Sequence, residues 1–187
     1  MSLVEQLRRR FARPPEQVRV AVEGAGDAEE RILTWGVLSG EEGWLVATSR
    51  GLRTVDAAGA AHDLLRWHEV ALARWTSQAS GGTFHVTALA EVEPGVQTRQ
   101  PARGFDLVDA GDLPATVRRR VDETVVASQR VPLPNGGAVL LVARRIPGQP
   151  GRDWTVVFDA DADRADPEAR EVARQKLAEV VAAERPD

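Results

Sequence analysis

Between Arg31 and Val108 the chain is a succession of short strand-like segments joined by tight turns, with no helical segment among them. Each segment is rich in β-branched and aromatic residues and is bounded by turn residues, which is typical of β-strands. Short connections without a crossover helix require antiparallel neighbours. The sequence therefore predicts a seven-stranded antiparallel sheet, with strands at residues 32–38, 44–48, 52–55, 70–76, 83–88, 91–97 and 104–108.

A helix is predicted directly after this sheet, from Asp112 as N-cap to about Glu123. Leu113, Val117 and Val121 repeat every four residues and give the helix one apolar face. A strongly bent sheet leaves one end of its core open, so we expect this helix to close the opening and its apolar face to be buried.

The rest of the chain predicts two flanking parts. Residues 1–30 form an N-terminal helix, from Ser2 to about Phe11, and a loop, and residues 31–124 hold the sheet and its capping helix. Residues 125–187 predict a three-stranded antiparallel sheet followed by a helix. Its hairpin turns at Asn135-Gly136, and its last helix begins at Asp166-Pro167.

Two segments within residues 31–124 carry a resemblance. One is the strand end Thr48-Ser49-Arg50-Gly51-Leu52, which has the pattern Thr-x-Arg-x-Leu. The other is Arg66-Trp67-His68-Glu69-Val70, followed by Trp75. Both resemble prokaryotic pleckstrin-homology-like (PH-like) domains, with Arg66 where the family usually has proline. The resemblance implies a split barrel of seven strands capped by a helix. The whole chain resembles a family of uncharacterised actinobacterial proteins, which implies no known activity.

Composition and missing motifs argue against several functions. The net charge is −4 and the pI is about 5.5, whereas general nucleic-acid binders are basic. Cysteine is absent, and no apolar run reaches the length of a membrane span. The first residues do not resemble a signal peptide, so we expect a cytoplasmic protein. No phosphate-binding glycine loop and no Gly-x-Ser-x-Gly motif is present. We therefore expect no cofactor and no catalysis.

Three sets of residues remain as candidates for a site. Asp159, Asp161 and Asp163 alternate as calcium ligands can, but Arg164 and Arg170 occupy the positions where an EF-hand loop has glycine and glutamate. Basic side chains gather beside the apolar stripe of the N-terminal helix, as in helices that lie on anionic membranes; they are Arg8, Arg9 and Arg10. Trp67 and His68 lie in a predicted turn, where we expect Trp67 to be partly exposed and to contact a partner.

The leading hypothesis is a non-enzymatic interaction or scaffolding protein that binds a protein partner or a second copy of itself. An open edge of the sheet offers a route, because an extended peptide can add to it as a further strand. A peripheral membrane module that uses the N-terminal helix is one alternative. A metal-dependent hydrolase that uses the three aspartates is the other.

Overall fold

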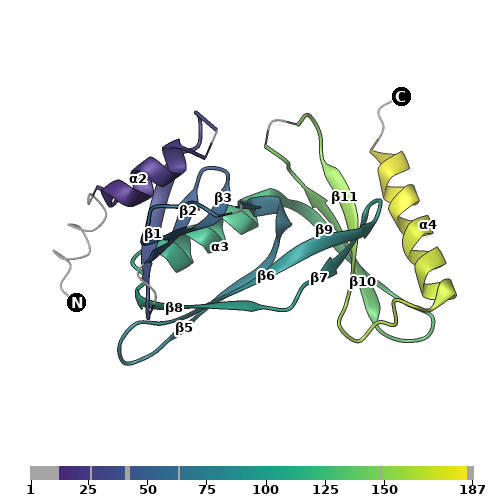
Figure 1. The fold of residues 1–187 in the computed structure, drawn as a ribbon. Helices are drawn as coiled ribbons and strands as arrows, with labels where there is room; N and C mark the ends of the chain where they lie inside the picture. The colour runs from purple at the N-terminus through teal and green to yellow at the C-terminus, as the bar shows by residue number, and fades with distance from the viewer. Residues whose placement is uncertain (1–12, 26, 41–42, 63, 148, 185–187) are drawn as a thin grey trace. The chain divides into compact units, whose positions relative to one another are not determined.

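The structure is a computed structural model that describes residues 13–25, 27–40, 43–62, 64–147 and 149–184. The described residues form a mixed α+β fold with three α-helices and one mostly antiparallel, open sheet of eleven strands (Figure 1). They divide into two compact units. The first contains residues up to 87 and residues 102–122, and the second contains residues 88–101 and 123 onward.

The sheet of the first unit contains six of the seven predicted strands and one short strand, Leu65–Arg66, that was not predicted. Neighbouring strands pair in the order β4-β3-β2-β1-β8-β6, and β5 pairs with the other edge of β6. The strands are β1 (Ile32–Leu38), β2 (Gly43–Thr48), β3 (Gly51–Asp56), β4 (Leu65–Arg66), β5 (Val70–Ser77), β6 (Gly82–Glu93) and β8 (Arg103–Asp109). Between β4 and β5 lies η1 (Trp67–Glu69), a single 3-10 turn.

The predicted strand at residues 91–97 is wrong in its bounds. β6 continues to Glu93, the chain turns at Pro94-Gly95, and a separate strand, β7 (Val96–Arg99), follows. Gly95 has φ +74°, a left-handed conformation that glycine adopts without steric cost. The proline thus ends one strand instead of interrupting an edge strand, and β7 belongs to the second unit.

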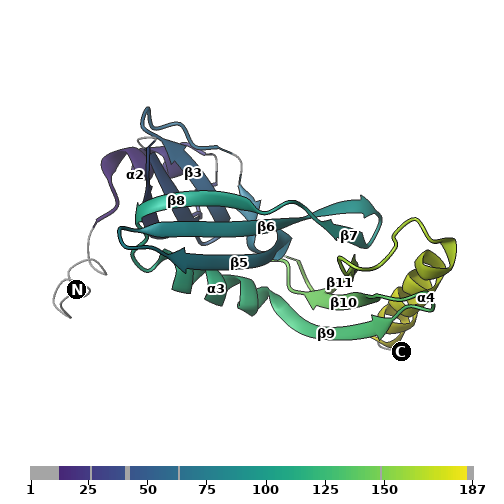
Figure 2. The same ribbon diagram turned by 90° about the horizontal axis from the view of Figure 1, so that it is seen from below.

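The capping helix is confirmed as α3 (Leu113–Thr124). Leu113 and Val117 are fully buried and Val121 is 8% exposed, and all three pack in one cluster with Phe84 and Leu107 of the sheet. Figure 2 shows α3 running beside β5. The predicted burial of the four-residue apolar repeat is therefore confirmed, and the repeat contributes to the core of the first unit.

A second helix, α2 (Glu16–Glu23), was not predicted. Val18 and Val22 are buried against Val46 and Val55 of the sheet. Valine is a weak helix former, so the local sequence gave little sign of the helix and tertiary packing decides it. The predicted helix Ser2–Phe11 lies outside the described residues.

In the second unit the three predicted strands are present as β9 (Val125–Pro132), β10 (Ala138–Arg144) and β11 (Asp153–Phe158), and the hairpin turns at Asn135-Gly136 as predicted. β11 also pairs with β7 in parallel, with Val156 opposite Val96. The second unit therefore contains residues 88–101 in addition to the predicted residues 125–187.

The last helix, α4 (Pro167–Ala183), begins where the sequence predicts. The carboxylate of Asp166 accepts a hydrogen bond from the backbone N–H of Glu168 at 3.0 Å, and Pro167 is the first helical residue. Ala169 and Ala173 are buried against β10 and β11, where Trp154 is half-buried in the same cluster. None of the helices described is both long enough and apolar enough to cross a membrane.

Candidate functional site

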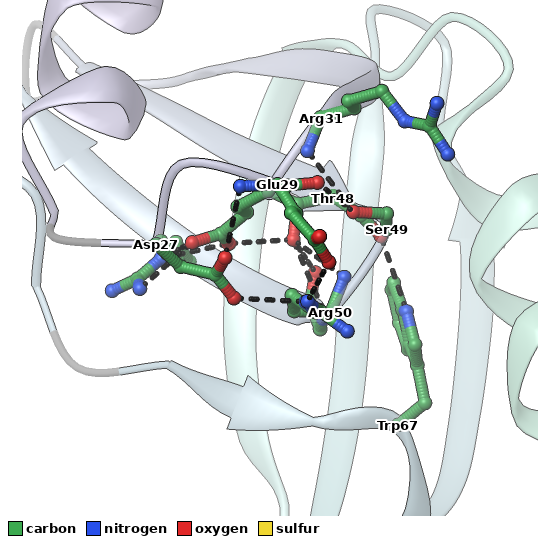
Figure 3. Close-up of polar contacts among 10 residues, drawn as sticks. Asp27, Glu29, Arg31, Thr48, Ser49, Arg50 and Trp67 are labelled. Carbon is green, nitrogen blue, oxygen red and sulfur yellow. Dashed lines mark hydrogen bonds and ion pairs between the residues drawn. The ribbon is translucent and has the colours of Figure 1, made fainter. Parts of the chain in front are cut away.

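Thr48, at the end of β2, is the centre of a polar network in the first unit (Figure 3). Its hydroxyl lies 2.7 Å from a carboxylate oxygen of Glu30, to which it donates. The hydroxyl oxygen of Thr48 also accepts the backbone N–H groups of Arg50 and Gly51, each at 3.1 Å. Thr48 is fully buried, so these bonds satisfy polar groups that water does not reach. The network fixes the tight turn that leads into β3.

Arg50 connects this turn to the segment that precedes β1 (Figure 3). Its guanidinium lies 2.8 Å from Asp27 and 3.0 Å from Glu29. The pKa of Asp27 is lowered, chiefly because its carboxylate accepts the backbone N–H of Glu29 and then because Arg50 is its neighbour. Ser49 adds two bonds to Arg31, one through its hydroxyl and one through its backbone N–H. The arrangement holds residues 27–31 on the β2–β3 turn.

Glu30 and Arg53 form a buried ion pair behind this turn. Arg53 binds the carboxylate through two nitrogens, and its Nη2 lies 3.0 Å from Glu30 Oε2. The side chains are 0% and 11% exposed for Glu30 and Arg53 respectively. A third guanidinium nitrogen donates to the backbone oxygen of His62 at 3.0 Å. Each carboxylate of this network already has a cationic or N–H partner, so the cluster works as a structural brace.

The expectation that Trp67 is partly exposed is wrong. The 3-10 turn η1 directs its side chain into the core, where it is 3% exposed and packs with Leu45 and Leu52. Its indole N–H donates to the backbone oxygen of Thr48 at 3.1 Å. The sequence did not predict this burial, because the direction of the turn depends on Thr48, a partner 19 residues away in the chain. His68, the neighbouring candidate, is half-buried.

A different feature of the first unit has the shape of a binding site. A cleft of about 590 Å³ lies between β5 and α3, within the size range of ligand pockets. β5 supplies one wall and the first three turns of α3 supply the other. The lining residues are Ala71, Leu72, Ala73, Arg74, Trp75, Phe84, Pro114, Ala115, Arg118, Val121 and Asp122.

The edge of β5 beside this cleft is open. Among the described residues, β5 pairs with no strand other than β6, so the backbone groups along its second edge have no strand partner. Leu72, in the middle of the strand, is 51% exposed. Natural edge strands are usually shortened, bulged or covered, because such an edge readily accepts another strand. An eight-residue edge with an exposed leucine is therefore a candidate docking site.

The predicted metal candidates do not form a metal site. Asp159 accepts two hydrogen bonds from Arg130, at 2.9 and 3.0 Å, and lies 3.9 Å from Arg99. Asp163 accepts the backbone N–H of Ala165 in a local turn, and Asp161 is exposed. Over the described part of the chain, no group of three or more potential ligands is placed to hold a metal ion. The basic candidates Arg8, Arg9 and Arg10 lie outside the described residues.

Comparison with known proteins adds no relative: no family model, no curated protein and no solved structure matches this chain.

Proposed function

We propose that this chain is a non-enzymatic interaction module of the cytoplasm whose first unit is a PH-like domain that binds an extended segment of a partner protein. The observation that carries the proposal is the open edge of β5 beside the cleft against α3. The strand succession and the buried apolar face of α3 support the PH-like part. The absence of cysteine among the 187 residues supports the location.

Strand addition fits this geometry better than binding of a compact ligand. The backbone of β5 offers a row of N–H and C=O groups, which bind an extended peptide whatever its sequence. Alternate side chains of the added peptide then point to one face, where the cleft receives them. Ala71 and Ala73 are small, so they leave space there, and Trp75 supplies an aromatic wall. Main-chain bonds give affinity and the cleft gives selectivity.

The experiment is a selection of random 12-residue peptides displayed on phage against the full chain. The peptides that bind are synthesised, and their affinities are measured by calorimetry. Each is then remade with N-methyl groups on alternate backbone nitrogens, in two versions that differ by one position. Strand addition uses every second N–H of the peptide, so we expect one version to lose binding and the other to keep it.

The result has a direct reading. A large difference in affinity between the two methylated versions supports strand addition. Weaker binding of the peptides to the variant Ala115→Trp, whose new side chain fills the cleft from an exposed position of α3, places the bound peptide at the cleft. Equal affinities of the two versions, or no selected peptide, would overturn the proposal. Because the methyl groups are on the peptide, the result does not depend on a protein variant that fails to fold.

A further inference from the structure

We infer that the segment bound at the edge of β5 is acidic: it carries an aspartate or glutamate that contacts Arg74 and Arg118, next to an apolar side chain held in the cleft. This inference rests on the proposed function and adds the chemical class of the ligand. The two arginines lie on different elements, β5 and α3, and both line the cleft. A peptide between the two walls therefore meets both.

The charges of the cleft are not balanced by the protein itself. Arg74 is exposed and makes no ion pair with any described residue. Arg118 lies 3.9 Å from Asp122, and the two side chains are 81% and 72% exposed. An ion pair this exposed contributes little, so a carboxylate of a ligand competes with it readily. With two guanidinium groups and one carboxylate, the lining carries a net positive charge and favours an anionic ligand.

Three other arginines of the first unit are used differently. Arg19, Arg50 and Arg53 each bind a carboxylate at 3.0 Å or less. The available charge of Arg74 therefore contrasts with these three paired arginines, and Arg74 is located where the sheet is open. On an edge strand a charge also discourages indiscriminate pairing, so Arg74 selects among ligands as well as attracting an acidic one.

The apolar contact is provided from both walls. Leu72 and Trp75 of β5 and Pro114 and Ala115 of α3 all line the cleft. An aliphatic or aromatic side chain of the ligand gains free energy by covering Leu72, which is otherwise half in water. The ligand is therefore an extended segment in which apolar and acidic residues lie close together, since one strand must satisfy both features.

A second copy of this chain fits the cleft less well. If two β5 strands paired around Arg74, each would present an arginine to the arginine of the other. Like charges directly opposite each other on neighbouring strands are destabilising. The edge thus favours a partner of different sequence and opposite charge.

The test repeats the peptide selection on the wild-type chain and on the double variant Arg74→Glu, Arg118→Glu. We expect wild-type ligands to be enriched in Asp and Glu and to lose about tenfold or more in affinity for the variant, which corresponds to ~1.4 kcal/mol. Replacing the acidic residue of a selected peptide by lysine should restore binding to the variant. Raising the salt concentration should weaken the wild-type complex.

A matched control has the same change of net charge away from the cleft. Arg31→Glu, Arg145→Glu replaces two exposed arginines that do not line it, and we expect it to bind the selected peptides as the wild type does. Circular dichroism and thermal melts establish that both double variants are folded. Equal loss of affinity in the two double variants would overturn the inference, because it would show a general charge effect.

The two proposals fail in different ways. Ligands that show the alternating N-methyl pattern but lack acidic residues and ignore Arg74→Glu, Arg118→Glu would overturn the acidic class and leave strand addition standing. Ligands without the alternating pattern, or no ligands at all, would overturn both.

Discussion

The indole N–H of Trp67 donates to the backbone oxygen of Thr48 across 3.1 Å, and this bond joins the segment 66–70 to the segment 48–52. The backbone N–H of Trp67 also lies 3.4 Å from the backbone oxygen of Arg50. The 3-10 turn before β5 is thus hydrogen-bonded to the turn between β2 and β3. Since β5 begins immediately after η1, this bond helps to set where its open edge starts.

We expect Trp67→Phe to lower the free energy of unfolding by about 1–3 kcal/mol, because it leaves the buried oxygen of Thr48 without its donor. Trp67→Ala should cost more, about 3–5 kcal/mol, since it also empties a large core volume. Urea unfolding measures both changes. Trp44→Phe is the control: Trp44 is half-buried, and its indole makes no hydrogen bond to another described residue. If Trp67→Phe and Trp44→Phe lower the free energy of unfolding equally, the bond to Thr48 is not the cause of the loss in Trp67→Phe.

The sequence was sufficient for features that depend on local pattern. Six of the seven strands predicted between residues 31 and 108, the apolar face of α3, the Asn135-Gly136 hairpin and the Asp166 cap follow from spacing and turn chemistry, and all are present. It was insufficient where distant partners decide. Val18 and Val22 form a helix because β2 and β3 bury them, and Trp67 is buried because Thr48 accepts its N–H.

Thr48→Val tests the polar centre of the β2–β3 turn. The replacement keeps the shape but removes the hydroxyl, so Glu30 loses a donor and two backbone N–H groups lose their acceptor. We expect a loss of about 2–3 kcal/mol in urea unfolding. Thr155→Val is the matched control, because Thr155 is 4% exposed and its hydroxyl has no partner among the described residues. That variant should be neutral or stabilising, and a comparable loss there would contradict the assignment.

Arg53, which is 11% exposed, and Arg50, which is 33% exposed, should respond differently to truncation. Arg53→Ala leaves the carboxylate of Glu30 buried without a cation, which should cost about 3–5 kcal/mol. Arg50→Ala should cost much less, because Glu29 is 85% exposed and water replaces the lost partner. Thermal melts at low and high salt distinguish the two cases further. Salt should narrow the difference between wild type and Arg50→Ala, and leave the effect of Arg53→Ala nearly unchanged. Similar losses in the two variants would contradict this division.

The candidate site was harder to find than the fold. The aspartates at 159, 161 and 163 were sequence candidates for a metal site, yet Asp159 is paired with Arg130 and Asp163 with a backbone N–H. The cleft is lined by alanines, a leucine and a proline that form no motif. Its openness depends on where the sheet ends and on which residues of α3 lie opposite β5. Both are properties of the assembled unit, and neither has a local sequence signal.

The cap of α4 makes a pH-dependent contribution to stability with a definite sign. The pKa of Asp166 is lowered, first because its carboxylate accepts a hydrogen bond from the side-chain amide of Asn135 and then because it accepts the N–H of Glu168. A carboxylate whose folded-state pKa is depressed stabilises the fold above its unfolded pKa of about 4, and the contribution is lost as the pH falls through the folded value. We expect Asp166→Asn to be less stable than the wild type at neutral pH, with the difference shrinking as the pH falls below about 4.

Thermal melts of the wild type and Asp166→Asn between about pH 7 and pH 3 measure that difference. Asparagine also caps helices well, so the loss of stability at neutral pH should be modest. That loss then reports the charge of Asp166 and not the geometry of the cap. Asp161→Asn is the control, because Asp161 is an exposed residue of the same loop, outside helix α4. Its effect on the melting temperature should be small. A difference between wild type and Asp166→Asn that stays constant into acid would show that the carboxylate is not the stabilising form, and would contradict the role assigned to this cap.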